Sequence, residues 1–195
     1  DDGGSQPRYT LIGHKNEVSA LAFSHDEKII ATGGEDNTIR IFDTYSGQEK
    51  TELVGHKGKI QQLIFDMDDN QLYSIGKDGL AIKWALDKNT ELVRFIGHAG
   101  PLTDMVLNPE GTRLVTSSED HTTRLWNAKT GEQIFLLEMH KGPVRHVDMT
   151  KNSKMILTGS DDQTISLWHA YNGRQLIQIS KHQGSIEEAF FSPDD

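Results

Sequence analysis

One interval recurs along the whole chain and constrains its fold more than any other feature. Five histidines stand 42 residues apart, at His14, His56, His98, His140 and His182. The same interval separates four aspartates and four aromatic residues, at Asp36, Asp78, Asp120, Asp162 and at Phe42, Trp84, Trp126, Trp168. Self-similarity at a fixed period of about 20–50 residues indicates a repeat protein. The chain therefore holds four full repeats in register and the start of a fifth.

Each repeat contains four short segments whose residue pattern is typical of β-strands. In the first segment, apolar residues stand four, seven and nine positions after the histidine, as at Val18, Leu21 and Phe23. The step of three from the first to the second of these predicts a β-bulge, because a bulge adds one residue to a strand. Glycine and asparagine tolerate positive φ most easily, so the last turn of each repeat predicts one left-handed position, at Gly47, Asn89, Gly131 and Gly173.

Four antiparallel strands in 42 residues correspond to one blade of a β-propeller, so the fold class is all-β. We expect blades at about residues 18–54, 60–96, 102–138 and 144–180, with a partial fifth at 186–195, so that the propeller segment covers 8–195. Residues 8–12 fit the fourth strand of a preceding blade and residues 186–191 the first strand of a following one. Residues 1–7 are expected to be a flexible acidic tail or linker.

Four blades and two flanking strands make an incomplete ring. Its end blades would leave apolar side chains and strand edges uncovered, which favours aggregation. We therefore expect the remainder of a longer chain, or another copy of this one, to close the ring.

The repeated motif resembles that of the WD-repeat β-propeller family, over about residues 8–195. The resemblance is carried by the Gly13-His14 type of opening and by the stretches at 33–43 and 160–168, which read GGEDNTIRIFD and SDDQTISLW. It implies a ring that most often has seven blades. The second repeat departs most, because Lys83 stands where the other repeats carry Ile41, Leu125 and Leu167. A lysine at that position is expected to extend to water or to meet an acid.

Each full repeat also carries a histidine, a hydroxyl residue, an aspartate and an aromatic residue at constant spacing. These groups could form a hydrolase triad, but four copies argue against it because a nucleophile is needed only once. The resemblance implies a structural hydrogen-bond network, which suits groups that both donate and accept. We assign to it His14, Thr32, Asp36, His56, Ser74, Asp78, Trp84, His98, Thr116, Asp120, Trp126, His140, Thr158, Asp162 and Trp168. Phe42 lacks an indole N–H, so the first blade should be the least tightly held.

The resemblance further implies that partners bind the narrow face of the propeller, three and five residues after the histidine and one residue before the aspartate. The matching positions include Glu17, Ser19, Glu35, Lys59, Gln61, Lys77, Thr103, Glu119, Arg145, Asp161 and Glu187. The sequence thus predicts a noncatalytic scaffold that binds protein partners within a multiprotein assembly. The alternative is a charge-dependent reader of a phosphorylated or ubiquitin-type partner, acting through Lys59, Lys77 and Arg145.

Composition disfavours several other classes of function. The chain has 20 basic and 29 acidic residues, a net charge of −9, which opposes binding to nucleic acid or to an anionic membrane. An enzyme and an RNA-associated propeller remain as weaker readings. The absence of cysteine excludes disulfides and thiolate sites, and no two of the nine histidines have helical zinc spacing. We expect no metal, no cofactor, no membrane span and an intracellular location, cytoplasmic or nuclear.

Overall fold

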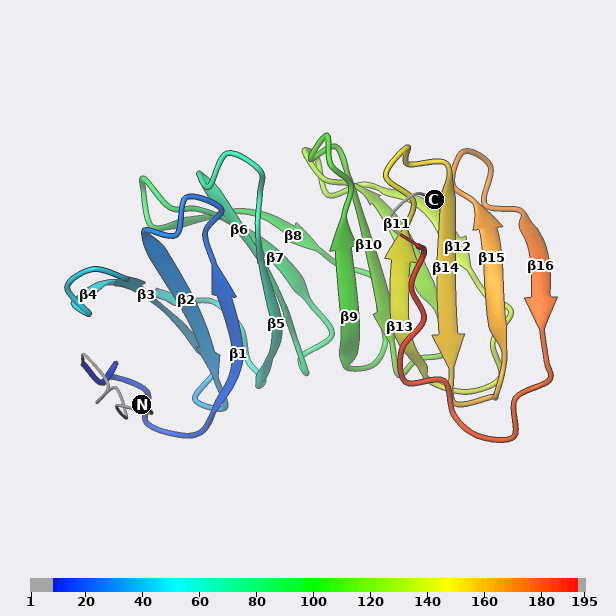
Figure 1. Ribbon diagram of the computed structural model, residues 1–195, viewed down its shortest axis with the longest axis horizontal. Coiled ribbons are helices and arrows are strands. Elements are labelled where there is room, and N and C mark those ends of the chain that lie inside the picture. Colours follow the sequence, from blue (N-terminus) through cyan, green and yellow to red (C-terminus); the bar gives the residue numbers. More distant parts are fainter. Residues whose placement is uncertain (1–8, 193–195) are drawn as a thin grey trace, which may run out of the picture.

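The repeats fold as separate blades. The computed structural model describes residues 9–192, which form sixteen strands in four antiparallel sheets of four strands each (Figure 1). Every sheet pairs its strands in sequence order, so one sheet corresponds to one repeat. The all-β blade architecture expected from the period of 42 residues is confirmed. No helix within the described residues is long and apolar enough to cross a membrane.

The strand bounds repeat from blade to blade. Blade 1 contains β1 (Val18–Phe23), β2 (Ile29–Gly34), β3 (Thr38–Asp43) and β4 (Glu49–Val54). Blade 2 contains β5 (Ile60–Phe65), β6 (Gln71–Gly76), β7 (Ala81–Ala85) and β8 (Thr90–Phe95). Blade 3 contains β9 (Leu102–Leu107), β10 (Arg113–Ser118), β11 (Thr123–Asn127) and β12 (Gln133–Leu137). Blade 4 contains β13 (Val144–Met149), β14 (Met155–Ser160), β15 (Ile165–His169) and β16 (Gln175–Ile179). The expected tail at residues 1–7 lies outside the described residues.

The first strand of every blade contains the bulge that its apolar spacing predicts. In blade 1, Val18 pairs with Gly34 and Ala20 with Gly33, which leaves Ser19 as the extra residue. The equivalent register shifts leave Gln61, Thr103 and Arg145 as extra residues in the other blades. The left-handed turn positions are confirmed as well, with φ from 52° to 78° at Gly47, Asn89, Gly131 and Gly173.

The hydrophobic core lies between blades. One cluster joins Ile41 and Leu53 of blade 1 to Leu63, Phe65 and Trp84 of blade 2. Equivalent clusters lie between blades 2 and 3 and between blades 3 and 4. The tryptophans of blades 2, 3 and 4 therefore pack against the preceding blade, and each blade depends on its neighbour to bury its apolar faces.

The arc of four blades is open at both ends. Leu21 and Phe23 of blade 1 are 56% and 57% exposed, whereas the equivalent Leu63 and Phe65 are buried against blade 1. At the other end, Ile177 and Ile179 on β16 are also exposed. Each open end presents the apolar face that a further blade would cover.

The two end segments differ from expectation because neither forms a strand. Residues 9–12 are irregular, with the ring of Tyr9 close to Gly47. Residues 186–191 lie beside β13 (Figure 1), where the Ile186 N–H donates to the Ser160 carbonyl at 3.1 Å. A ladder needs a second strand of the same blade, and residues 9–192 contain none for this segment.

Lys83 also differs from expectation. It is buried on β7, and its Nζ donates to the carbonyl oxygen of Ala128 in blade 3 at 3.3 Å. The same Nζ lies 5.4 Å from the centre of the Tyr73 ring. Burial lowers the pKa of Lys83. The expectation that this lysine would reach water or pair with an acid was wrong, because the next blade covers it and supplies a carbonyl instead.

Candidate functional site

In blades 2, 3 and 4 the structure brings the histidine, hydroxyl residue, aspartate and tryptophan of the repeat together. In blade 3, the indole N–H of Trp126 donates to Thr116 Oγ1 at 2.8 Å. Thr116 Oγ1 lies 2.9 Å from His98 Nε2, and His98 Nδ1 lies 2.9 Å from the Asp120 carboxylate. Blades 2 and 4 have the same arrangement through Ser74 and Thr158. With the imidazole neutral, Nδ1 donates to the carboxylate and Nε2 accepts from the hydroxyl.

The aspartate of each network also binds the backbone of the loop that carries the histidine. Asp162 accepts the N–H of Lys141 at 2.8 Å and the hydroxyl of Thr164 at 2.6 Å. Burial alone would raise the pKa of Asp162, but hydrogen bonds from Thr164, the Lys141 N–H and His140 lower it to about 2. The carboxylate therefore stays charged at neutral pH and joins two loops of its blade.

The histidines of three of these networks are buried. The side chain of His56 is fully buried, and those of His98 and His140 are 1% exposed. Burial lowers the pKa of His98 despite its bond to Asp120, which keeps the imidazole neutral. No group of three or more histidine, aspartate or glutamate side chains in the described residues could hold a metal.

The network of blade 1 lacks one member. His14 Nε2 lies 2.8 Å from Thr32 Oγ1, and its Nδ1 lies 3.0 Å from Asp36. Phe42 fills the position of the tryptophan and has no N–H to donate. The Thr32 hydroxyl consequently serves one side chain, whereas its equivalents serve two.

Several of the candidate partner-binding residues are joined in ion pairs between blades. They lie on the narrow face, by which we mean the loops that carry the repeat histidines and aspartates. Lys59 of blade 2 meets Glu35 of blade 1, with Nζ 2.7 Å from Oε1. Arg145 of blade 4 lies 3.1 Å from Glu119 of blade 3 and 2.6 Å from Asp161 of its own blade.

Other candidate residues form hydrogen bonds between blades or remain free. The bulge residues Ser19 and Thr103 donate to the carbonyls of Ile60 and Val144 at 2.7 and 2.6 Å, each in the following blade. The half-buried bulge residue Gln61 makes no side-chain hydrogen bond among residues 9–192. Three other candidate residues, Glu17, Lys77 and Glu187, have exposed side chains that make no ion pair or hydrogen bond in that same range.

Sequence reasoning missed one buried pair. His146 Nδ1 lies 2.7 Å from the carboxylate of Asp104, which also accepts the Val147 N–H at 3.0 Å. The His146 side chain is only 13% exposed. The repeat itself could have indicated the pair, because Asp104 and His146 both stand six residues after a repeat histidine and so occupy equivalent sites on neighbouring first strands.

Comparison with known families agrees with this geometry. The family model described as "WD domain, G-beta repeat" matches residues 5–43, 89–127 and 131–169, more than half of the chain. The chain belongs to the WD40 repeat family. The matched segments leave out most of the second WD40 repeat, which is the one that carries Lys83 in place of an apolar residue.

One curated relative overlaps the WD40 chain briefly. "Protein FIZZY-RELATED 3" of Arabidopsis thaliana is 45% identical over 38 residues. That overlap covers 20% of this chain and 8% of the relative. Because the shared segment is shorter than one repeat, it supports the repeat type and not a shared activity.

Proposed function

We propose that this WD40 chain is a noncatalytic scaffold that binds protein partners through its narrow face within a larger assembly. Support comes from the contrast between the two kinds of polar residue on each blade. The buried networks rigidify the blades, while charged side chains at the same loops remain in solvent. Rigid blades that present exposed loops are a common basis for binding.

The exposed charge at Lys77 is the observation on which the proposed surface depends. Lys59 and Arg145 would have to give up intramolecular ion pairs before they could bind a partner. Lys77 has no such pair among the described residues and is exposed at the turn after β6. An acidic group on a partner could therefore bind Lys77 without breaking a bond in the scaffold, and such charges set orientation and association rate more than affinity.

The narrower alternative, a reader of phosphorylated or ubiquitin-type partners, has less support. It requires Lys59, Lys77 and Arg145 to act together on one negative group. Two of these three cations are neutralised by Glu35, Glu119 and Asp161. We therefore favour a protein partner with a mixed-charge surface.

Charge reversal tests this proposal. Affinity capture with the wild-type chain is compared, by quantitative mass spectrometry, with capture by Lys77→Glu and by Lys88→Glu. Lys88 is also an exposed lysine, at the turn between β7 and β8 on the opposite face, and serves as the control. Partners that use the narrow face should be lost with Lys77→Glu and kept with Lys88→Glu. Equal recovery with the two variants would exclude Lys77 as part of the binding surface.

A further inference from the structure

Polar contacts join blades 1 and 2 at both faces of their boundary, and we call each such contact a clamp. On the narrow face, Lys59 pairs with Glu35. On the opposite face, the Asp69 carboxylate of blade 2 accepts the backbone N–H groups of His25 and Asp26 in blade 1, at 2.9 and 3.0 Å. Charge-assisted bonds of this kind are about twice as strong as neutral ones.

The boundary between blades 3 and 4 is clamped in the same two places. Arg145 pairs with Glu119 on the narrow face. On the opposite face, Ser153 of blade 4 stands at the repeat position of Asp69 and donates to the Glu110 carboxylate of blade 3 at 2.9 Å. Asp69 and Ser153 adopt φ of 56° and 59°, so the two clamps use one turn geometry.

The middle boundary, between blades 2 and 3, lacks both clamps. Gly111 occupies the position of Asp69 and Ser153, with φ of 63°, and a Cβ there would have no atom within 4 Å. On the narrow face Pro101 replaces Lys59, and Lys77 stands where the other boundaries have a glutamate. None of the ion pairs formed by residues 9–192 crosses this boundary.

The interior of the middle boundary is also less favourable. Lys83 and Tyr73 lie there, at positions where blade 1 carries Ile41 and Ala31. The Tyr73 hydroxyl is buried without a hydrogen-bond partner. Burying polar groups with incomplete hydrogen bonding destabilises an interface. The boundary between blades 3 and 4 also buries polar groups, but there Asp104 and His146 pair with each other.

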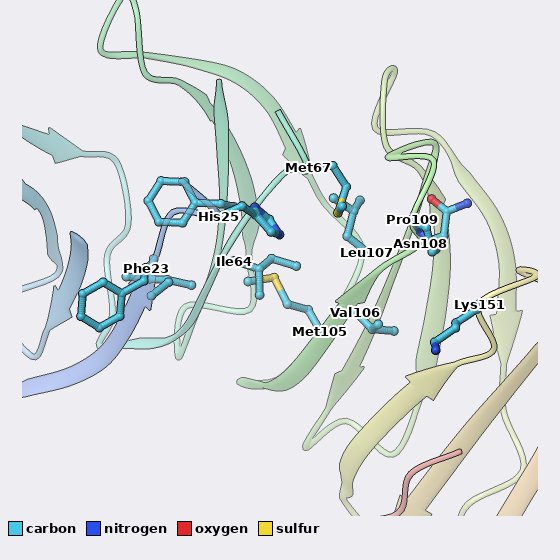
Figure 2. Close-up of a pocket in the computed structure, with 13 residues that line it drawn as sticks. Phe23, His25, Ile64, Met67, Met105, Val106, Leu107, Asn108, Pro109 and Lys151 are labelled. Carbon is cyan, nitrogen blue, oxygen red and sulfur yellow. The ribbon is translucent and has the colours of Figure 1, made fainter. Parts of the chain in front are cut away.

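A cavity of about 700 Å³ extends over the first strands of blades 1, 2 and 3, and Lys151 of blade 4 also lines it. Ile64 and Met67 of blade 2 line it together with Met105 and Leu107 of blade 3 (Figure 2). At the middle boundary, Met67 lines this cavity and is 61% exposed.

From these differences we infer that the chain moves as two rigid pairs of blades, 1–2 and 3–4, about a hinge at the middle boundary. The bonds that cross the hinge are few: the Met105 N–H donates to Gln62 Oε1 at 2.7 Å, and Lys83 donates to Ala128. Packed interfaces shift between discrete arrangements, and here no ion pair has to break. Opening changes the distance from Lys77 to the charges of blades 3 and 4, so a partner spanning that face selects one curvature.

Two native methionines report on the hinge. Met105 is 3% exposed at the middle boundary, and Met149 is 8% exposed at the boundary between blades 3 and 4. The full chain is treated with dilute peroxide, and oxidation of each methionine is followed by peptide mass spectrometry. If the middle boundary opens, Met105 is oxidised faster than Met149 although it is the less exposed of the two. Oxidation of Met149 as fast as, or faster than, Met105 overturns the hinge.

Adding the missing clamp provides the decisive comparison. Gly111→Asp places a carboxylate where it can accept the N–H groups of Met67 and Asp68, as Asp69 does for blade 1. Met105 oxidation should slow about fivefold, the change in equilibrium that one net hydrogen bond produces, with Met149 unchanged. Gly184→Asp adds the same charge at an open site and should alter neither rate.

A second variant covers the case in which Gly111→Asp disturbs its turn. Lys77→Glu with Pro101→Lys recreates the spacing of Glu35 and Lys59, which stand 24 residues apart. This variant should also slow the oxidation of Met105 and leave that of Met149 unchanged. Equal slowing of both methionines, or of neither, in whichever variant folds would refute the hinge and leave the proposed partner surface to its own test.

Discussion

Replacing the network hydroxyl in two blades separates the contribution of the indole from that of the imidazole. Thr116→Val removes a hydroxyl that bonds to the side chains of both Trp126 and His98, whereas Thr32→Val removes one whose only side-chain partner is His14. Valine has nearly the shape of threonine, so packing is retained. The difference between the variants should then reflect the number of buried polar groups left unpaired.

The magnitude follows from the count of orphaned groups. A buried donor or acceptor without a partner costs about 1–3 kcal/mol. Thr116→Val leaves two such groups without a partner and should lower the free energy of unfolding by about 2–4 kcal/mol. Thr32→Val leaves one without a partner and should lower it by about 1–2 kcal/mol. Thr10→Val, at an exposed position, should change it by less than about 0.5 kcal/mol.

Hydrogen exchange read by mass spectrometry suits the measurement, because a repeat array can open blade by blade. Protection of β10 is compared in Thr116→Val and wild type, and protection of β2 in Thr32→Val and wild type. Urea unfolding gives the total change. Equal losses in the two blades would show that the indole N–H contributes nothing, and the network would then not explain the recurrence of tryptophan.

Three further outcomes concern other parts of the molecule. Amides of blade 1 should exchange faster than their equivalents in blades 2–4, because Phe42 leaves its network one member short; slowest exchange there would contradict this. In a His146→Gln background, which removes a histidine of raised pKa, the urea midpoint should fall as the pH drops below about 6.5. Below that pH the unfolded chain binds a proton that buried His98 resists; a midpoint that rises on acidification would refute the argument. Leu21→Ser with Phe23→Ser should reduce concentration-dependent association in light scattering, and unchanged association would show that the open face of blade 1 is not adhesive.

The fold was predictable because each structural device is repeated. A single step of three among apolar residues indicates little, but the same step in every repeat places the bulges at Ser19, Gln61, Thr103 and Arg145. The left-handed turn position of each repeat was predictable for the same reason. The end segments were not, because a strand there depends on partners that the described residues do not contain.

The sequence predicts which loops carry the charged residues of the narrow face, but not which of these residues form ion pairs. The repeat register places Glu119 and Arg145 on neighbouring blades, yet they stand 26 residues apart and Glu35 and Lys59 stand 24 apart. An ion pair forms only where the two side chains are long enough to meet across the bulge. The residue pattern does not show at which spacing this happens. Lys83 shows the same limit, because its acceptor is a backbone carbonyl of another blade.

Within residues 9–192 every backbone ladder ends within its own blade, and apart from the connecting loops only side-chain contacts and isolated hydrogen bonds join one sheet to the next. A duplication or deletion cut in the loop before a repeat histidine would therefore add or remove a whole module and leave every remaining ladder intact. In such a chain the number of modules is free to change during evolution, while the junction residues decide the angle at which each new module is set.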